Sequence, residues 1–334
     1  QGGSLEVIGA FWVEPDANLI SGESFVRQIM HGVRFFEKEF GVTPTTVWNP
    51  DVFGNAWTMP QILRRAGVRH FVTHKMILWN DTNTWTTNAF WWQGPDGSRI
   101  FANVPPTGFI GTLEPDHVTE HWTKFSEKDT LGESLYHYGW GDGGGGPDVE
   151  MLESIDRFKN FPGITPGRHT RVQDALDRLY EKAVDSDDIA VHNDELYLEE
   201  HRGTYTTKGL FKKLNRHCEN TYREAELFAS FAPQPYPQRE LFDGWKEVLT
   251  NQFHDSLPGS HVRVVYEDLV ESYGRCVPVG ENALRNAIEA IAEKVNTTGE
   301  GRALVVFNSL GHNRTTMVSV EMEDADVRVL DPRG

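Results

Sequence analysis

The order of secondary-structure signals along the chain most constrains its fold. Apolar runs and helix-period segments alternate over the first part of the chain, starting with an apolar run at 5–13 and a helical pattern at 22–40. Strands are expected at 45–49 and 69–74, with a helix at 58–66 between them. Alternation of this kind predicts an α/β fold in which helices cover a parallel sheet.

The next segments extend this pattern with a hairpin and two more strands. Residues 89–104 carry aromatic residues before the turn sequence Gly94-Pro95-Asp96-Gly97 and apolar residues after it, which predicts a hairpin. Further strands are expected at 134–138 and 189–198, and a helix at 170–183 between them. A strand that follows a helix in this way is typical of a parallel sheet.

The pattern changes near residue 206. Three long helical segments follow at 207–232, 239–254 and 262–296 with no strand signal between them, and they predict a helical bundle. Alternating apolar residues at 303–310 and 315–322 then predict the beginning of an antiparallel β domain.

Charge and cysteine content exclude some classes of function. Thirty-two Lys and Arg residues against forty-nine Asp and Glu residues give a net charge of −17. We therefore expect no nucleic-acid partner and no anionic membrane partner, because both require a cationic face. The chain has two cysteines, Cys218 and Cys276, which excludes a disulfide framework and favours a cytoplasmic location.

Three short motifs carry residues capable of chemistry. Asp51 follows the predicted strand 45–49, and Asp142 lies between Gly141 and a run of four glycines. The carboxyl ends of parallel strands form the active sites of α/β proteins, but either residue alone could equally cap a helix or lie in a solvated loop. His254 and Asp255 end an apolar helix, where a histidine is a metal ligand or simply a partner of the helix dipole.

Seven segments, taken together and in this order, resemble the α-mannosidases of glycoside hydrolase family 38. The resemblance is closest to the cytosolic and vacuolar-like branch, which includes bacterial members. The segments are WVEPDANLISGESFVRQ (12–28), VWNPDVFGNAWTMPQILRRAG (47–67), WNDTN (79–83), FWWQGPDGSRIF (90–101), GWGDGGGGP (139–147), DELYLEEHRGTYTT (194–207) and NQFHDSLPGS (251–260).

The resemblance implies a domain organisation that agrees with the pattern above. Residues 1–205 would form a parallel β/α barrel-like catalytic domain, truncated at its start. Residues 206–298 would form a three-helix middle domain, and residues 299–334 the start of a C-terminal β-sandwich domain.

The resemblance also implies a retaining α-mannosidase that acts through a covalent glycosyl-enzyme intermediate. Asp51 would be the nucleophile and Asp142 the general acid and base. Asp51 and His254 would bind Zn²⁺ or another divalent cation. The expected substrates are α-mannosides and mannose-containing oligosaccharides, and a homo-oligomer is left open. The residues expected to contact substrate are Phe53, Lys75, Arg202 and Asp255.

One part of the family pattern is absent. The family uses a further His and Asp from a His-x-His-x-Asp-x-x-Trp-like stretch, which does not occur in this sequence. We therefore expect an internal piece of a larger enzyme, with weak zinc binding and little activity by itself. The alternatives are a metal-dependent deacetylase or amidase on a related barrel, and a catalytically incompetent fragment.

Overall fold

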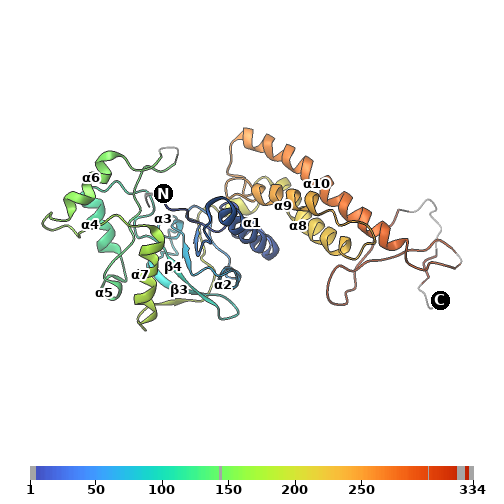
Figure 1. Cartoon of the computed structure of the whole chain (residues 1–334), viewed down its shortest axis with the longest axis horizontal. Coiled ribbons are helices and arrows are strands. Elements are labelled where there is room, and N and C mark those ends of the chain that lie inside the picture. Colours follow the sequence, from blue (N-terminus) through green and yellow to red (C-terminus); the bar gives the residue numbers. More distant parts are fainter. Residues whose placement is uncertain (1–4, 143–144, 300, 322–327, 331–334) are drawn as a thin grey trace.

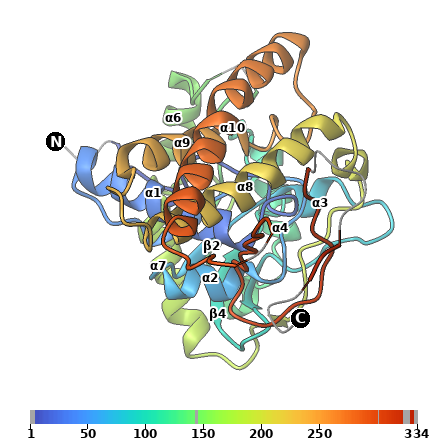
Figure 2. The same cartoon turned by 90° about the vertical axis from the view of Figure 1, so that its right-hand side faces the viewer.

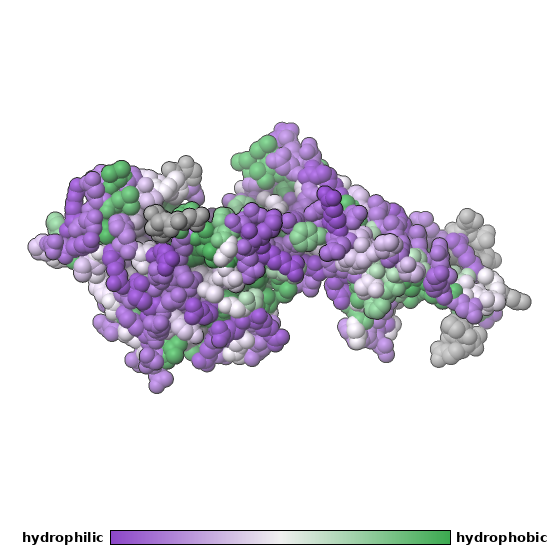
Figure 3. Space-filling model, viewed as in Figure 1, coloured by the Kyte–Doolittle hydropathy of each residue, from purple (hydrophilic) through white to green (hydrophobic). Residues whose placement is uncertain are grey.

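The computed structural model describes residues 5–142, 145–299, 301–321 and 328–330. Figure 1 shows an elongated molecule, with a sheet and shorter helices at one end and three long helices at the other. Within the described residues, no helix is long and apolar enough to cross a membrane. Hydrophilic residues dominate the face shown in Figure 3, and hydrophobic residues lie there in small separate areas.

Five strands form one mixed sheet in the order β1-β2-β4-β3-β5. β1, β2 and β4 are parallel, β3 pairs antiparallel with β4, and β5 joins the other edge of β3 in parallel. The α/β class is therefore confirmed, and the described strands form an open mixed sheet. The strands are β1 (Thr46–Trp48), β2 (His70–Val72), β3 (Ala89–Gln93), β4 (Arg99–Asn103) and β5 (Val191–His192).

Shorter helices surround this sheet. The helices are α1 (Gly22–Phe40), α2 (Met59–Arg65), α3 (Lys75–Leu78), α4 (Pro115–Lys124), α5 (Lys128–Leu131), α6 (Val149–Phe158), α7 (Val172–Val184) and the 3₁₀ helix η1 (Arg202–Tyr205). The predicted helix at 22–40 is confirmed as α1. It begins where the Ser21 side chain accepts a hydrogen bond from the Ser24 N–H, and it ends at Gly41, whose φ of 66° suits glycine.

The two faces of the sheet are buried in different clusters. Phe90 and Trp92 pack with residues of α1 and α2, whereas Phe101 packs with residues of α7 such as Leu176. Successive residues of a strand point to opposite faces, so an aromatic hairpin can fill both sides. The predicted hairpin at 89–104 is thus confirmed, and it forms the centre of the α/β region.

Three long helices follow the α/β region. They are α8 (Gly209–Ala229), α9 (Gln238–Asn251) and α10 (Arg263–Ala292), each shorter than the predicted segment by a few residues. Tyr222 and Trp245 are fully buried between them, and the Tyr222 hydroxyl donates to the Cys276 carbonyl at 2.6 Å. In Figure 2 these helices lie in front of the sheet.

Two strand predictions are wrong, and a third is confirmed only in part. Residues 5–13 form no strand, because the Trp12 N–H donates to the Gln28 carbonyl of α1 rather than to a neighbouring strand. Residues 134–138 also form none, since Leu135 packs against helices. Of 189–198, only the short β5 is a strand, after which the Glu195 N–H bonds to the Asp194 carboxylate in a turn.

The two predicted C-terminal strands are also absent from the described residues. Residues 303–310 and 315–321 have no regular hydrogen-bond ladder, and Met322 lies outside the described residues. Met317 is 97% exposed and Val306 59% exposed. Alternation stabilises a strand only where a partner strand and a buried face are available, and the described part of this segment has neither.

Candidate metal and catalytic site

Asp51 lies just beyond the carboxyl end of β1. The Asn49 N–H still bonds to the Val72 carbonyl of β2, so the chain leaves the sheet only after Asn49. The following loop is fixed to β2 by a bond from the His74 N–H to the Pro50 carbonyl. Lys75, the first residue of α3, places its Nζ 2.7 Å from Asp51 Oδ1. The parallel strands thus bring a carboxylate and an ammonium group together at one edge of the sheet.

His254 reaches this edge from the end of α9. Its backbone N–H donates to the Glu14 carbonyl at 3.0 Å, and Pro15 pairs with Phe253 in an isolated antiparallel bridge. Nδ1 lies 3.1 Å from the same Glu14 carbonyl, which requires the proton on Nδ1. Nε2 is then directed at Asp51, with 3.3 Å between it and Oδ2. Two segments far apart in sequence are therefore joined at the site.

Asp255 completes a cluster with ligand spacing for a cation. One ligand atom from each of Asp51, His254 and Asp255 lies within 4.8 Å of the others. One imidazole nitrogen and two carboxylates form a donor set that suits zinc, and three protein ligands leave a position for water or substrate. The described residues therefore fit a divalent cation. The family resemblance implied Asp51 and His254 as ligands, but Asp255 only as a substrate contact.

The electrostatics of the cluster favour a charged carboxylate. Burial acts to raise the pKa of Asp51, but hydrogen bonds from His254 and Lys75 outweigh it and lower the pKa to about 2. Burial lowers the pKa of His254, whereas its bond to Asp51 and the charge of Glu14 leave that pKa raised overall. Burial raises the pKa of Glu14 to about 7. A proton and a metal ion compete for the same histidine nitrogen.

Aromatic rings form a wall beside Asp51. Phe53 is 5% exposed, stacks on His201 with a centroid distance of 5.0 Å, and meets His254 edge-on. Trp79 contacts His201 edge-on, and the Lys75 ammonium lies 5.6 Å from its ring centroid. Sugar rings present apolar C–H faces, so such a wall suits a saccharide. Phe53 and Lys75 thus adjoin Asp51, as the predicted substrate contacts require.

Two predicted residues are not joined to this cluster by any recorded contact of the described residues. Asp142 is exposed in the loop after Trp140, and no hydrogen bond or ion pair links it to Asp51. Its loop packs on the segment that follows β4, since a Cβ at Gly141 would lie 2.1 Å from Ile110. Arg202, on η1, lines a separate cleft.

Buried polar groups at the strand ends were not found from the sequence. Asn49, Thr73 and Asn103 follow or end the three parallel strands, and each is at most 2% exposed. Four polar side-chain atoms here are buried without a hydrogen-bond partner: Nδ2 and Oδ1 of Asn49, the Thr73 hydroxyl and Oδ1 of Asn103. Unpaired buried groups are costly, so they indicate a polar interior behind Asp51. Asn49, a polar residue at the end of the predicted apolar strand 45–49, was the signal that could have found them.

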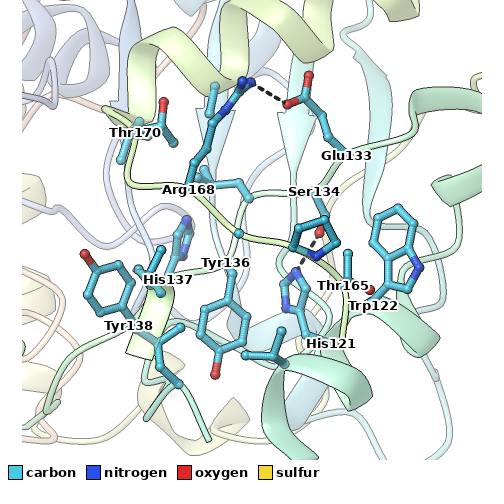
Figure 4. A pocket seen from close by; sticks show the side chains of 18 of the residues that line it. His121, Trp122, Glu133, Ser134, Tyr136, His137, Tyr138, Thr165, Arg168 and Thr170 are labelled. Atoms are coloured by element: carbon cyan, nitrogen blue, oxygen red, sulfur yellow. Dashed lines mark hydrogen bonds and ion pairs between the residues drawn. The ribbon is translucent and has the colours of Figure 1, made fainter. Parts of the chain in front are cut away.

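A cavity of about 890 Å³ lies elsewhere, between β1, α4, α6 and α7. Figure 4 shows Arg168 directed at Glu133, and Ser134 beside His121. Asp51 and His254 do not line it. The assignment of the candidate site to Asp51 and His254 therefore follows from their chemistry and contacts, and not from the size of a cavity.

Comparison with known proteins identifies the family. The sequence profile of the glycosyl hydrolases family 38 N-terminal domain matches residues 1–195, and that of the alpha mannosidase middle domain matches residues 199–291. The chain therefore belongs to glycosyl hydrolase family 38. It is 35% identical to alpha-mannosidase 2C1 of Mus musculus over 95% of its own length, and 33% identical to an alpha-mannosidase of Saccharomyces cerevisiae over 94%.

The matched relatives are longer than this chain. The chain spans 30% of the length of both relatives. An alpha-mannosidase structure from Enterococcus faecalis V583 superposes with a TM-score of 0.71 at 22% identity, covering 87% of this chain and 34% of that one. At this identity the structural likeness shows the fold alone.

Proposed function

We propose that this chain carries the catalytic centre of a retaining α-mannosidase. The observation that carries the proposal is the Asp51 carboxylate, held by Lys75 at 2.7 Å and facing His254 at 3.3 Å at the carboxyl end of parallel strands. The sequence identity of 33–35% between this chain and two alpha-mannosidases supports the same reaction. The expected substrates are terminal α-linked mannose residues of oligosaccharides or glycans.

The reaction would proceed in two displacements. An oxygen of Asp51 attacks the anomeric carbon while the bond to the leaving oxygen breaks, and Asp142 donates a proton to that oxygen. Water then attacks the same carbon, gives its proton to Asp142, and releases mannose and the Asp51 carboxylate. This mechanism needs the carboxyl groups of Asp51 and Asp142 about 5–5.5 Å apart in the complex with substrate. The low pKa of Asp51, about 2, suits a nucleophile that must be ionised.

Asp51, His254 and Asp255 would hold the cation, and we propose zinc. When bound, it supplies a positive charge that binds sugar hydroxyls and polarises them. Lys75 keeps Asp51 oriented, while Phe53 supports the apolar face of the sugar. Asp255 is 3.9 Å from His254 Nε2, so it can reach either the cation or a substrate hydroxyl.

The domain organisation that we propose has three parts. We propose a barrel-like catalytic domain over 1–205, a three-helix domain over 206–298, and the start of a β-sandwich domain over 299–334. The buried thiols of Cys218 and Cys276 are free, which supports a reducing compartment such as the cytoplasm. We expect no nucleic-acid partner because the net charge is −17.

Hydrolysis of an aryl α-mannoside tests the proposal. The wild type should release the phenol at a low rate, together with mannose of retained α-configuration, whereas Asp51→Asn should be inactive and Asp187→Asn, an exposed control, unchanged. A deacetylase or amidase would instead release acetate or ammonia and form no glycosyl adduct. A wild type that leaves the mannoside intact under zinc saturation would contradict the proposal for this chain.

A further inference from the structure

A second cleft of about 510 Å³ lies beside the loop 79–85. We call it the distal cleft. Trp79, at the start of this loop, contacts Lys75 and His201 near Asp51, whereas later residues of the loop line the distal cleft. The other side chains that matter for its chemistry are Trp85, Asp194, Glu195, Tyr197, Glu199 and Arg202.

The loop at the distal cleft is held in one conformation. The Glu199 carboxylate accepts hydrogen bonds from the backbone N–H groups of Asp81, Thr82 and Asn83 at 2.8, 2.7 and 2.6 Å. Asn80 bonds to the carbonyl of Tyr197 and accepts from the N–H of Glu199. These bonds connect the two walls of the cleft. A preformed cleft loses little conformational entropy when it binds a ligand.

Several groups in the distal cleft are free to bind. The Arg202 guanidinium, the Glu195 carboxylate and the Tyr197 hydroxyl have no side-chain hydrogen bond or ion pair recorded within the described residues. They offer a donor, an acceptor and a group that can do both. Trp85 is partly buried and is fixed by Phe90 and His192 at centroid distances of 5.2 and 4.9 Å.

This combination matches the chemistry of a neutral sugar. A hexose has hydroxyls that need donors and acceptors at its edge, and apolar C–H faces that pack on aromatic rings. The carboxylates of Asp194, Glu195 and Glu199 line the cleft together with a single guanidinium, that of Arg202, so an anionic sugar would be repelled. Arg202 directly follows His201, which stacks on Phe53 beside Asp51. The short segment His201–Arg202 therefore runs from the aromatic wall beside Asp51 to the lining of the distal cleft.

We propose that the distal cleft binds a second, uncharged hexose ring of an oligosaccharide whose terminal mannose lies at Asp51. This inference rests on the proposed function and specifies its substrate as a saccharide longer than one ring. Contacts to a ring remote from the cleaved bond contribute binding energy that a small aryl glycoside cannot use.

Two substrates of different length test the proposal. Glu195→Ala and Tyr197→Ala should lower kcat/KM for an α-linked mannotriose about tenfold and change it less than twofold for 4-nitrophenyl α-mannoside, because only the triose reaches the distal cleft. Asp187→Ala, an exposed acidic control between α7 and β5, should leave both values unchanged. Equal losses on both substrates, or no loss on the triose, would overturn the proposal.

Calorimetric titration separates failure of this inference from failure of the proposed function. If the wild type hydrolyses neither substrate, the proposed function fails, and mannotriose binding to the wild type and the variants still decides the role of the distal cleft. Binding that weakens about tenfold in Glu195→Ala supports the proposal, and absent or unchanged binding overturns it. Tyr197→Phe, which retains the ring, replaces Tyr197→Ala if circular dichroism shows that the alanine variant is unfolded.

Discussion

Replacement of Gly280 by alanine should destabilise the packing of α10 on α8. A Cβ at Gly280 would lie 2.6 Å from Cε2 and 2.7 Å from Cδ2 of Tyr222, far inside van der Waals contact. The Tyr222 ring is fully buried, and its hydroxyl donates to the Cys276 carbonyl. The ring therefore cannot move aside without losing a hydrogen bond or disturbing Trp245, whose ring centroid is 5.5 Å away.

The magnitude follows from opposing contributions. Overpacking a buried site costs about 1–3 kcal/mol, and losing the Tyr222 hydrogen bond would add about 1 kcal/mol. Alanine in place of glycine within a helix gains about 1 kcal/mol. We expect Gly280→Ala to lower the free energy of unfolding by about 1–3 kcal/mol. Gly274 is exposed in the same helix and its Cβ would meet nothing within 4 Å, so Gly274→Ala should instead stabilise by up to about 1 kcal/mol.

Urea denaturation followed by far-ultraviolet circular dichroism compares the two variants, and amide hydrogen exchange locates the effect in α8 and α10. Tyr222→Leu should reduce the loss of stability caused by Gly280→Ala, because the effects of substitutions at contacting residues on the free energy of unfolding are not additive. Equal stabilisation by Gly280→Ala and Gly274→Ala would refute the packing argument.

Three further predictions concern the site and buried histidines. A 5-fluoro-glycosyl trap should label Asp51, as peptide mass mapping would show, and labelling elsewhere contradicts its role. His254→Ala should lower zinc content at least about tenfold, measured by metal analysis beside His217→Ala, an exposed control. Burial lowers the pKa of His121 to about 4 and of His137 to about 3. Below about pH 6.5 the unfolded chain then binds more protons than the folded chain. The free energy of unfolding should therefore fall by about 3 kcal/mol per histidine as the pH is lowered from 6.5 to 4. Pulse proteolysis across that range measures it, and a flat profile contradicts it.

Local signals allowed prediction of much of the fold. The helix α1 carries its own cap at Ser21 and its own stop at Gly41, so its bounds were predictable within a residue. The hairpin of β3 and β4 was predictable because Gly97, with a φ of 81°, closes its turn. Signals of this kind depend on neighbours in sequence.

The remaining strands depend on partners that sequence patterns do not identify. Residues 5–13 are apolar enough for a strand, yet Ala10 and Phe11 are buried against other parts of the chain without any ladder. Likewise, Tyr136 lies 4.8 Å from His121 of α4 by ring centroids and belongs to no strand. Hydrophobic alternation identifies a segment that must be buried, whereas the neighbour that buries it is decided by tertiary packing.

The candidate site itself lies where the α/β region meets the long helices. Asp51 and His254 are 203 residues apart in sequence, and backbone bonds position them: Asp16 N–H to the Gln252 carbonyl, and His254 N–H to the Glu14 carbonyl. Side chains reinforce the contact, because Arg27 of α1 pairs with Glu226 of α8. The helical region therefore supplies a candidate metal ligand. A substitution that shifts α9 should lower metal affinity even when the strand pairing of the sheet is unchanged.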